Sequence, residues 1–220
     1  MIKNLVVFFA VALNIASAEG TEETYPEFAQ LIEPYGYTWE AHKAQTRDAY
    51  ILTMFRITGK NGAESKDEER KPVLLAHGLH MDSTSWFKSP GHAGDFTPLP
   101  LALYDAGFDV WLSNSRGTKY SQGHAALRGM ENDRDFWYWS YAEFAKLDAP
   151  AELKKIKEET SVDKVAYIGY HLTSTSMFLQ LSTGEDQLAD LMERFVSIDP
   201  CLIHRSESTY LDYLLNEARM

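Results

Sequence analysis

The stretch Val165–Phe178 reads VAYIGYHLTSTSMF, and it decides the fold that the sequence predicts. Val165–Gly169 is a short apolar run typical of a buried strand, and a helix is expected from Leu172 to Leu181. A strand that ends at a glycine, turns sharply and enters a helix is the context of the motif G-x-S-x-G, in which the turn displays a nucleophilic serine. Here the segment reads GYHLT, so His171 stands at the serine position and Thr173 at that of the last glycine.

Strand and helix patterns alternate on both sides of this stretch. Short apolar runs predict further strands, and a polar tract predicts an exposed loop at Gly59–Lys71. A surface helix is expected at Pro150–Glu159, with proline in its first turn and Leu153 and Ile156 on one face. The expected further strands are Tyr50–Ile57, Val73–Ala76, Phe108–Leu112 and Phe195–Ile198. This alternation predicts an α/β fold, a mostly parallel sheet with flanking helices.

Composition limits the classes of partner. The chain has 220 residues, 45% of them hydrophobic, which is enough to bury one sizeable core. Its formal net charge is −11. Nucleic acid is therefore not an expected partner, because phosphate binding needs clustered Lys and Arg. Anionic membranes are disfavoured for the same reason, whereas neutral lipid surfaces and uncharged substrates remain open.

The N-terminus has the pattern of a secretory signal peptide over residues 1–18. Lys3 precedes an apolar run, and Ala16-Ser17-Ala18 has the small residues of a cleavage site. The run is too short for an integral membrane anchor, so the mature chain is expected to begin near Glu19. Secretion implies an oxidising compartment, but Cys201 is the single cysteine and cannot form an intrachain disulfide. We expect Cys201 to be buried.

Several segments resemble the acid lipase family of gastric and lysosomal lipases. They are LLAHGLH from Leu74, DAGFDVWLSNSRGTKY from Asp105, DFWYWSYAEFAKLDAPA from Asp135 and KVAYIGY from Lys164. The tract from Phe28 to Asp48, with GYTWEAHKAQTRDAYIL, resembles the N-terminal lipase-associated region of that family.

This resemblance implies an α/β-hydrolase fold and an ancestry in the hydrolysis of acyl esters such as triglycerides and cholesteryl esters. It divides the chain into a signal peptide at 1–18, a lipase-associated region at 19–70 and a partial hydrolase core at 71–220. The C-terminal part and the lid of the family are expected to be missing. The expected location is secreted, or the lumen of the lysosome or endomembrane system.

The family elbow reads GHSQG, so the resemblance places the nucleophile at His171. A histidine nucleophile is not expected to work here, and Thr173 suggests a relaxed or distorted turn, because the missing glycine normally relieves crowding. The segment His77-Gly78-Leu79 resembles the family's HGL turn. The resemblance therefore assigns the oxyanion hole to the backbone amides of Leu79 and Leu172, while His77 is expected to be structural.

Other residues are weaker catalytic candidates. Ser174 and Ser176 are expected inside the helix, and Ser115 lies in an NSRG segment that resembles a structural loop of the family. Asp199 follows a strand, as some catalytic acids do, but His204 is too close in sequence to face it in the usual geometry. The later triad members are thus expected to be absent from this chain.

Histidine spacing does not predict a metal site. His77 and His80 are three residues apart, and His92 and His124 are scattered, but the sequence contains neither H-E-x-x-H nor C-x-x-C. We expect no metal and no cofactor.

Three functions from different classes remain. The favoured one is a secreted, catalytically inactive lipase-like protein, a pseudoenzyme that retains binding of a neutral lipid or acyl ester. The second is an active lipase of which this chain is a truncated form, and the third is a secreted interaction protein. The oligomeric state is not predicted.

Overall fold

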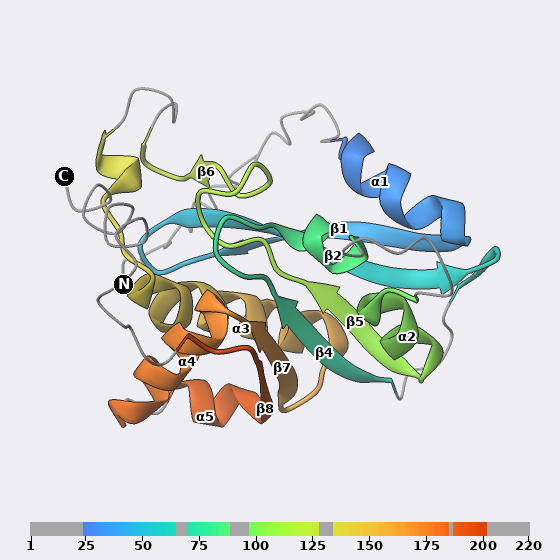
Figure 1. The fold of residues 1–220 in the computed structure, drawn as a ribbon. Coiled ribbons are helices and arrows are strands. Elements are labelled where there is room, and N and C mark those ends of the chain that lie inside the picture. The colour runs from blue at the N-terminus through green and yellow to red at the C-terminus, as the bar shows by residue number, and fades with distance from the viewer. Residues whose placement is uncertain (1–23, 65–69, 89–96, 128–133, 185–186, 202–220) are drawn as a thin grey trace, which may run out of the picture.

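A computed structural model describes residues 24–64, 70–88, 97–127, 134–184 and 187–201 (Figure 1). The predicted signal peptide at 1–18, the cleavage near Glu19, and the candidates His92 and His204 lie outside the described residues.

One mixed sheet organises the described chain. Its main strands follow the order β1-β2-β5-β4-β7-β8, and two short strands, β3 and β6, pair with β2. Strands β5, β4, β7 and β8 are parallel to one another, whereas β2 is antiparallel to both β1 and β5. The strands are β1 Tyr37–Gln45, β2 Tyr50–Lys60, β3 Ala63–Glu64, β4 Lys71–Ala76, β5 Phe108–Leu112, β6 Gly123–His124, β7 Val165–Tyr170 and β8 Met192–Ile198.

Helices cover both faces of this sheet. They are α1 Pro26–Ile32, α2 Leu99–Asp105, α3 Ala149–Thr160, α4 Leu172–Ser182 and α5 Gln187–Leu191. Short helical turns occur at Glu33–Tyr35, Ser83–Phe87 and Arg134–Trp137, and a π-helical turn at Phe144–Asp148 leads directly into α3. Figure 1 shows α3, α4 and α5 together, apart from α1 and α2.

The alternation of side chains along β4 separates two hydrophobic cores. Val73 and Leu75 pack in one core with residues of α1 and α2. Leu74 and Ala76 pack in the other with residues of α3, α4 and α5. Because successive side chains of a strand point to opposite faces, a parallel strand buried on both faces is apolar throughout, as this one is. The predicted α/β fold, mostly parallel with flanking helices, is confirmed.

The predicted strands and helices all appear, with ends that differ by a few residues. The predicted loop Gly59–Lys71 is wrong at both ends, since β2 runs to Lys60 and β4 begins at Lys71. Asn61 and Gly62 have φ angles of 53° and 76° and join β2 to β3 by a two-residue hairpin. Asn-Gly favours such a turn because both central residues need positive φ.

The sequence analysis did not anticipate strand β1. It pairs with β2 over nearly its whole length and so joins the N-terminal region to the sheet of the core. On the same side, Phe28 of α1 stacks on Phe55 of β2 with ring centroids 4.0 Å apart. The N-terminal region is therefore packed against the central sheet through an aromatic contact.

Cys201 is half-buried rather than buried, and it is a free thiol. Its backbone N–H donates to Thr175 Oγ1 at 3.0 Å, which holds the segment after β8 against α4. This backbone hydrogen bond holds the segment in place without burying the thiol. The expectation that Cys201 is buried is therefore wrong.

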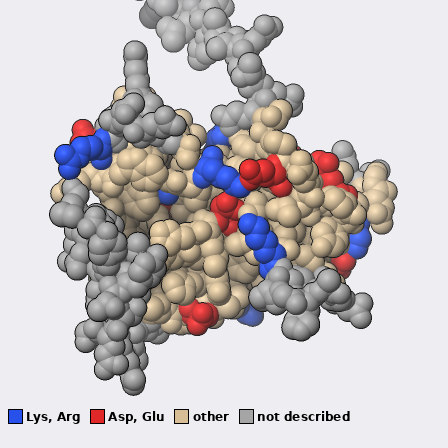
Figure 2. Space-filling model, turned by 45° about the horizontal axis from the view of Figure 1, so that its top comes forward, with Lys and Arg blue, Asp and Glu red and all other residues tan. Residues whose placement is uncertain are grey.

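The face drawn in Figure 2 carries Lys, Arg, Asp and Glu side chains interspersed among other residues, with no large patch of one sign. Among the helices of the described residues, none combines the length and the apolar composition that a bilayer crossing requires.

Candidate functional site

The candidate site lies where the direction of chain progression across the sheet reverses. From β4 the chain moves to β5 on one side, and it then returns to β7 on the other side of β4. Ligands of open α/β sheets bind at the carboxyl ends of the strands at such a switch point. The carboxyl end of β4 leads into His77, and that of β7 leads into His171.

His171 forms a sharp elbow between β7 and α4. Its φ and ψ angles are 52° and −110°, a conformation that costs a residue with a side chain about 1–3 kcal/mol. The His171 N–H donates to the carbonyl of Ile198 in β8 at 2.9 Å, and the His171 carbonyl accepts from the N–H of Thr175 at 3.0 Å. The strained turn of the motif is thus retained although its serine is not.

The expectation that Thr173 relaxes or distorts this turn is wrong. The Thr173 side chain is buried, and its hydroxyl lies 3.1 Å from the carbonyls of both Ala76 and Tyr170. It also accepts from the N–H of Tyr170 at 3.2 Å. Threonine is accommodated because its hydroxyl ties the start of α4 to the ends of β4 and β7.

We predict that Thr173→Val lowers the free energy of unfolding by about 1–3 kcal/mol. Valine keeps the shape of the side chain, but the backbone groups of Ala76 and Tyr170 lose the hydroxyl as a hydrogen-bond partner. Thr173→Ser retains the hydroxyl and is the matched control. Denaturant unfolding of both variants measures the difference. Equal stability of the two variants would show that these hydrogen bonds do not support the elbow.

The HGL turn packs directly against the elbow. A Cβ atom added to Gly78 would lie 3.0 Å from Tyr170 Cδ1 and 3.1 Å from His171 Cβ, so only glycine fits without displacing its neighbours. The backbone N–H groups of Leu79 and Leu172 have no hydrogen-bond acceptor in the described part of the chain. Two amide groups from adjacent turns are therefore available beside the elbow.

The imidazole of His171 has no catalytic partner among the described residues. Its Nδ1 atom is buried and makes no hydrogen bond within the described ranges. Asp199 follows β8 with a φ of 49° and is exposed, and among the described residues it makes no hydrogen bond or ion pair with a histidine. The structure thus brings His171, Leu79 and Leu172 to neighbouring turns and does not pair Asp199 with a base.

His77 is held as a structural histidine. Its Nε2 accepts from the backbone N–H of Ser115 at 3.1 Å, so the proton lies on Nδ1, which is 2.9 Å from the carbonyl of Gly78. Burial lowers the pKa of His77, which favours this neutral form. The side chain therefore links the loop after β5 to the HGL turn.

The three serine candidates are buried within the framework rather than displayed at the elbow. Ser115 binds His77 through its backbone, and its carbonyl accepts from Thr118. The hydroxyls of Ser174 and Ser176 donate to the carbonyls of Gly169 and Thr173 at 2.5 and 3.2 Å. That none of the three is the nucleophile stays a prediction.

A buried charge cluster that the sequence analysis missed lies beneath this framework. The Arg116 side chain is fully buried and binds Asp148 at 2.6 Å and Asp48 at 2.6 Å. Its guanidinium carbon also lies 4.1 Å from the ring centroid of Tyr50. Burial raises the pKa of Asp148 to about 6 against the opposing effect of Arg116, so this pair is ionised at neutral pH. Arg116 and Asp148 lie within the quoted SNSRG and KLDAP segments, but no local pattern shows that they meet.

Glu152 of α3 is buried nearby, and its carboxyl group accepts a hydrogen bond from the Ser113 hydroxyl at 2.7 Å. Burial raises the pKa of Glu152 to about 8, and the negative charge of Asp148 contributes to the rise. The carboxyl group is therefore largely protonated at neutral pH. Among the described residues, no three His, Cys, Asp or Glu side chains form a group suited to holding a metal.

The strand order, the strained elbow and the adjacent glycine turn define the α/β-hydrolase class. The family model described as the alpha/beta hydrolase fold matches residues 71–209, well over half of the chain. A second model, the partial alpha/beta-hydrolase lipase region, matches residues 28–90. The chain belongs to the α/β-hydrolase family. The second match, together with gastric and lysosomal relatives, confirms its resemblance to the acid lipases.

Its relatives include individual gastric and lysosomal lipases. The chain is 34% identical over 183 residues to gastric triacylglycerol lipase of Rattus norvegicus, covering 82% of this chain and 44% of that protein. It is 33% identical over 178 residues to lysosomal acid lipase/cholesteryl ester hydrolase of Homo sapiens, covering 81% and 43%. The chain thus spans a little under half the length of these relatives.

Among solved structures, naproxen esterase of Bacillus subtilis is similar with a TM-score of 0.50 and 14% identity. The similarity covers 87% of this chain and 54% of that one and concerns the fold alone.

Proposed function

We propose that this protein is a lipase-like protein of the secretory or lysosomal lumen that binds neutral acyl esters at the elbow without hydrolysing them through a serine. The observation that carries the proposal is His171 at the tip of the retained elbow, with φ and ψ of 52° and −110°. This conformation costs a residue with a side chain about 1–3 kcal/mol, yet the turn keeps it although the serine is gone.

The backbone supports binding more than it supports chemistry. The amides of Leu79 and Leu172 have no acceptor among the described residues, and backbone N–H groups in such an arrangement bind the carbonyl oxygen of an ester. Hydrolysis also needs an activated nucleophile and an oriented base. Among the described residues, His171 makes no side-chain hydrogen bond that would orient it, and the hydroxyls of Ser174 and Ser176 donate to backbone carbonyls.

An active lipase with a longer chain is the second candidate, because this chain spans under half the length of its lipase relatives. Residues beyond Met220 would then supply an acid and a base. His171 argues against this candidate, since an added acid and base would still find no serine at the elbow.

A serine-directed phosphonate probe tests the proposal. We expect native protein to be labelled no more than denatured protein, because these reagents report an activated nucleophile rather than any hydroxyl. Binding of the native protein to a triglyceride emulsion, compared with a phosphatidylcholine dispersion alone, measures the retained affinity for neutral acyl esters.

Stoichiometric labelling at Ser115, Ser174 or Ser176 would show that the nucleophile lies elsewhere in this chain. Failure to bind the emulsion would favour an interaction protein without a lipid ligand.

A further inference from the structure

Exposed aromatic side chains follow one another on the segment between β6 and the π-helical turn. Trp137 is 47% exposed, Tyr138 is 92% exposed and Tyr141 is 40% exposed. We call these three residues the aromatic patch. Single exposed apolar side chains are ordinary, whereas neighbouring ones mark a surface that contacts another molecule. The aromatic patch is therefore a candidate interaction surface.

Contacts with the loop after β5 place the aromatic patch at the carboxyl edge, the edge of the sheet at which the parallel strands end. The ring of Trp137 lies beside Gly117, since a Cβ atom added to this glycine would be 2.8 Å from Trp137 Cζ3. Trp137 also packs against the buried Phe136, with ring centroids 5.0 Å apart. Gly117 follows the carboxyl end of β5, as the elbow follows that of β7. In Figure 1 the yellow segment that contains the patch lies on the side toward which β4 and β5 point.

The loop that contacts the aromatic patch also connects it to the elbow. Ser115, two residues before Gly117, donates its backbone N–H to His77 Nε2 at 3.1 Å. His77 begins the HGL turn, which packs against the elbow through Gly78. Met81, which follows this turn, is 38% exposed. The carboxyl edge thus presents exposed apolar side chains from two segments as well as the elbow.

The charges around the aromatic patch suit a surface without net charge. Residues 134–147 contain two basic residues, Arg134 and Lys146, and two acidic ones, Asp135 and Glu143, so their formal charges cancel. The whole chain has a net charge of −11 and is repelled by an anionic membrane. Tryptophan and tyrosine combine an apolar ring with a polar tip, which suits them to the boundary between lipid and water.

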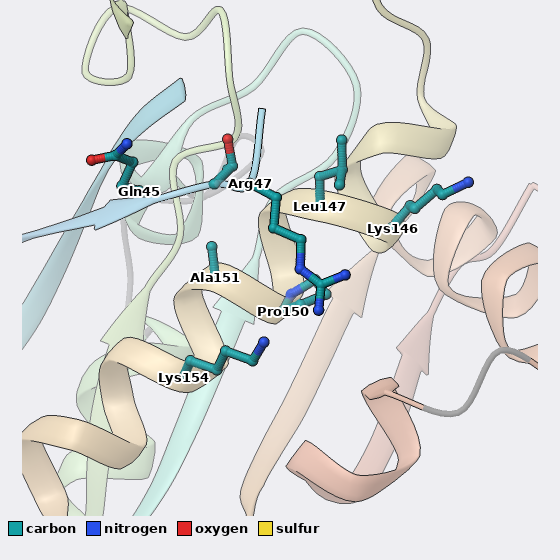
Figure 3. Close-up of a pocket in the computed structure, with 8 residues that line it drawn as sticks. Gln45, Arg47, Lys146, Leu147, Pro150, Ala151 and Lys154 are labelled. Atoms are coloured by element: carbon teal, nitrogen blue, oxygen red, sulfur yellow. The ribbon is translucent and has the colours of Figure 1, made fainter. Parts of the chain in front are cut away.

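A cavity of the described chain does not offer such a surface. It has a volume of about 250 Å³ and lies between the β1–β2 hairpin and the helical segment that leads into α3 (Figure 3). Its lining includes Arg47, Lys146 and Lys154. Covering charged groups with an apolar chain removes their hydration, so this cavity is a poor site for an acyl chain. The aromatic patch has no charged member and avoids this cost.

We propose that the aromatic patch docks the protein on a lipid–water interface without net charge and so turns the elbow toward the lipid. This role rests on the proposed function, since it brings the elbow to the acyl esters that it would bind. Trp137 is already held by Phe136 and Gly117, so its ring loses little freedom on docking. Tyr138 is the most exposed member and removes the most apolar area from water when lipid covers it.

Flotation of the full chain with a triolein emulsion stabilised by phosphatidylcholine tests the docking surface. We expect the wild type to float with the emulsion, and Tyr138→Ser to weaken its partition by about tenfold. Because Tyr138 is 92% exposed, its replacement leaves the fold intact. Tyr35→Ser is the matched control, since Tyr35 is 50% exposed and lies near Tyr37, at the amino edge of the parallel strands. We expect its partition to stay within about twofold of wild type.

Triacetin, a soluble triester, separates the aromatic patch from the elbow. Calorimetric titration with triacetin measures ester binding without a lipid surface, and we expect equal affinities for wild type and Tyr138→Ser. If triacetin does not bind but flotation still depends on Tyr138, the proposed function fails and the docking surface stands. The docking surface is overturned if the wild type does not float, or if Tyr138→Ser and Tyr35→Ser float alike. Flotation that is abolished by about 1 M salt would also overturn it, because ionic contacts would then carry the binding.

Discussion

Replacing Arg116 by methionine is expected to lower the free energy of unfolding by about 3–5 kcal/mol. The side chain is fully buried and holds the carboxylates of Asp148, which is 2% exposed, and Asp48, which is 36% exposed. Without the guanidinium, Asp148 remains in the interior as an uncompensated charge or must take up a proton. Denaturant unfolding at pH 7 measures the change.

Two further variants separate this mechanism from a general loss of packing. Arg116→Met combined with Asp148→Asn leaves no charge at the Asp148 position and should be more stable than Arg116→Met alone. Lys71→Met removes the exposed pair with Glu193 and should change stability by no more than about 1 kcal/mol. If the double variant is no more stable than Arg116→Met, the buried charge is not the cause.

Replacing Glu152 by glutamine changes the free energy of unfolding by an amount that depends on pH. We expect this change to be more favourable at pH 7 than at pH 4 by up to about 3 kcal/mol. The folded-state pKa of Glu152 is raised by burial from an ordinary value of 4.5 to about 8. Between these values the folded chain holds a proton that the unfolded chain releases. Wild-type stability is therefore highest below pH 4.5 as far as this group is concerned, and it falls as the pH rises toward 8.

Glutamine keeps the acceptor for the Ser113 hydroxyl and has no proton to lose, so Glu152→Gln removes this part of the pH dependence. Glu158→Gln, at an exposed position of the same helix, is the matched control. Unfolding curves of the three proteins from pH 4 to pH 8 measure the effect. We expect the wild type to lose stability relative to Glu152→Gln as the pH rises. If the two proteins show the same pH dependence over this interval, the raised pKa of Glu152 is contradicted. The contribution of Glu152 to stability is thus greatest in acid, which suits a protein proposed for a lysosomal lumen.

The sequence predicted the central strands of the fold because β4 and β7 lie inside the sheet and read as apolar runs, and β5 carries a single charged residue, Asp109, in an otherwise apolar run. It did not predict β1, whose nine residues include only two buried ones and alternate imperfectly. The hairpin at Asn61-Gly62 was assigned to a polar loop, although this dipeptide is a strong turn pattern. Local composition concealed both features.

The candidate site was predictable where a motif fixes the backbone. The elbow and the HGL turn follow strands with recognisable patterns, so His171, Leu79 and Leu172 were named from the sequence. The conformation at Thr173 was not predictable, because its hydroxyl reaches the carbonyl of Ala76, 97 residues away. The cluster around Arg116 was missed for the same reason, since long-range contacts between charged side chains have no periodic pattern.

The central claim is that the elbow has lost its nucleophile but retains its backbone conformation. Turnover of a short-chain chromogenic ester tests this claim most directly. We compare wild type, His171→Ala and His171→Ser. We predict that all three stay far below about 1 per second, with the serine variant at most slightly faster, because the described part of the chain holds no oriented base beside the elbow. Wild-type turnover of about 1 per second or more that is abolished in His171→Ala would show that His171 is a working nucleophile and would contradict this account.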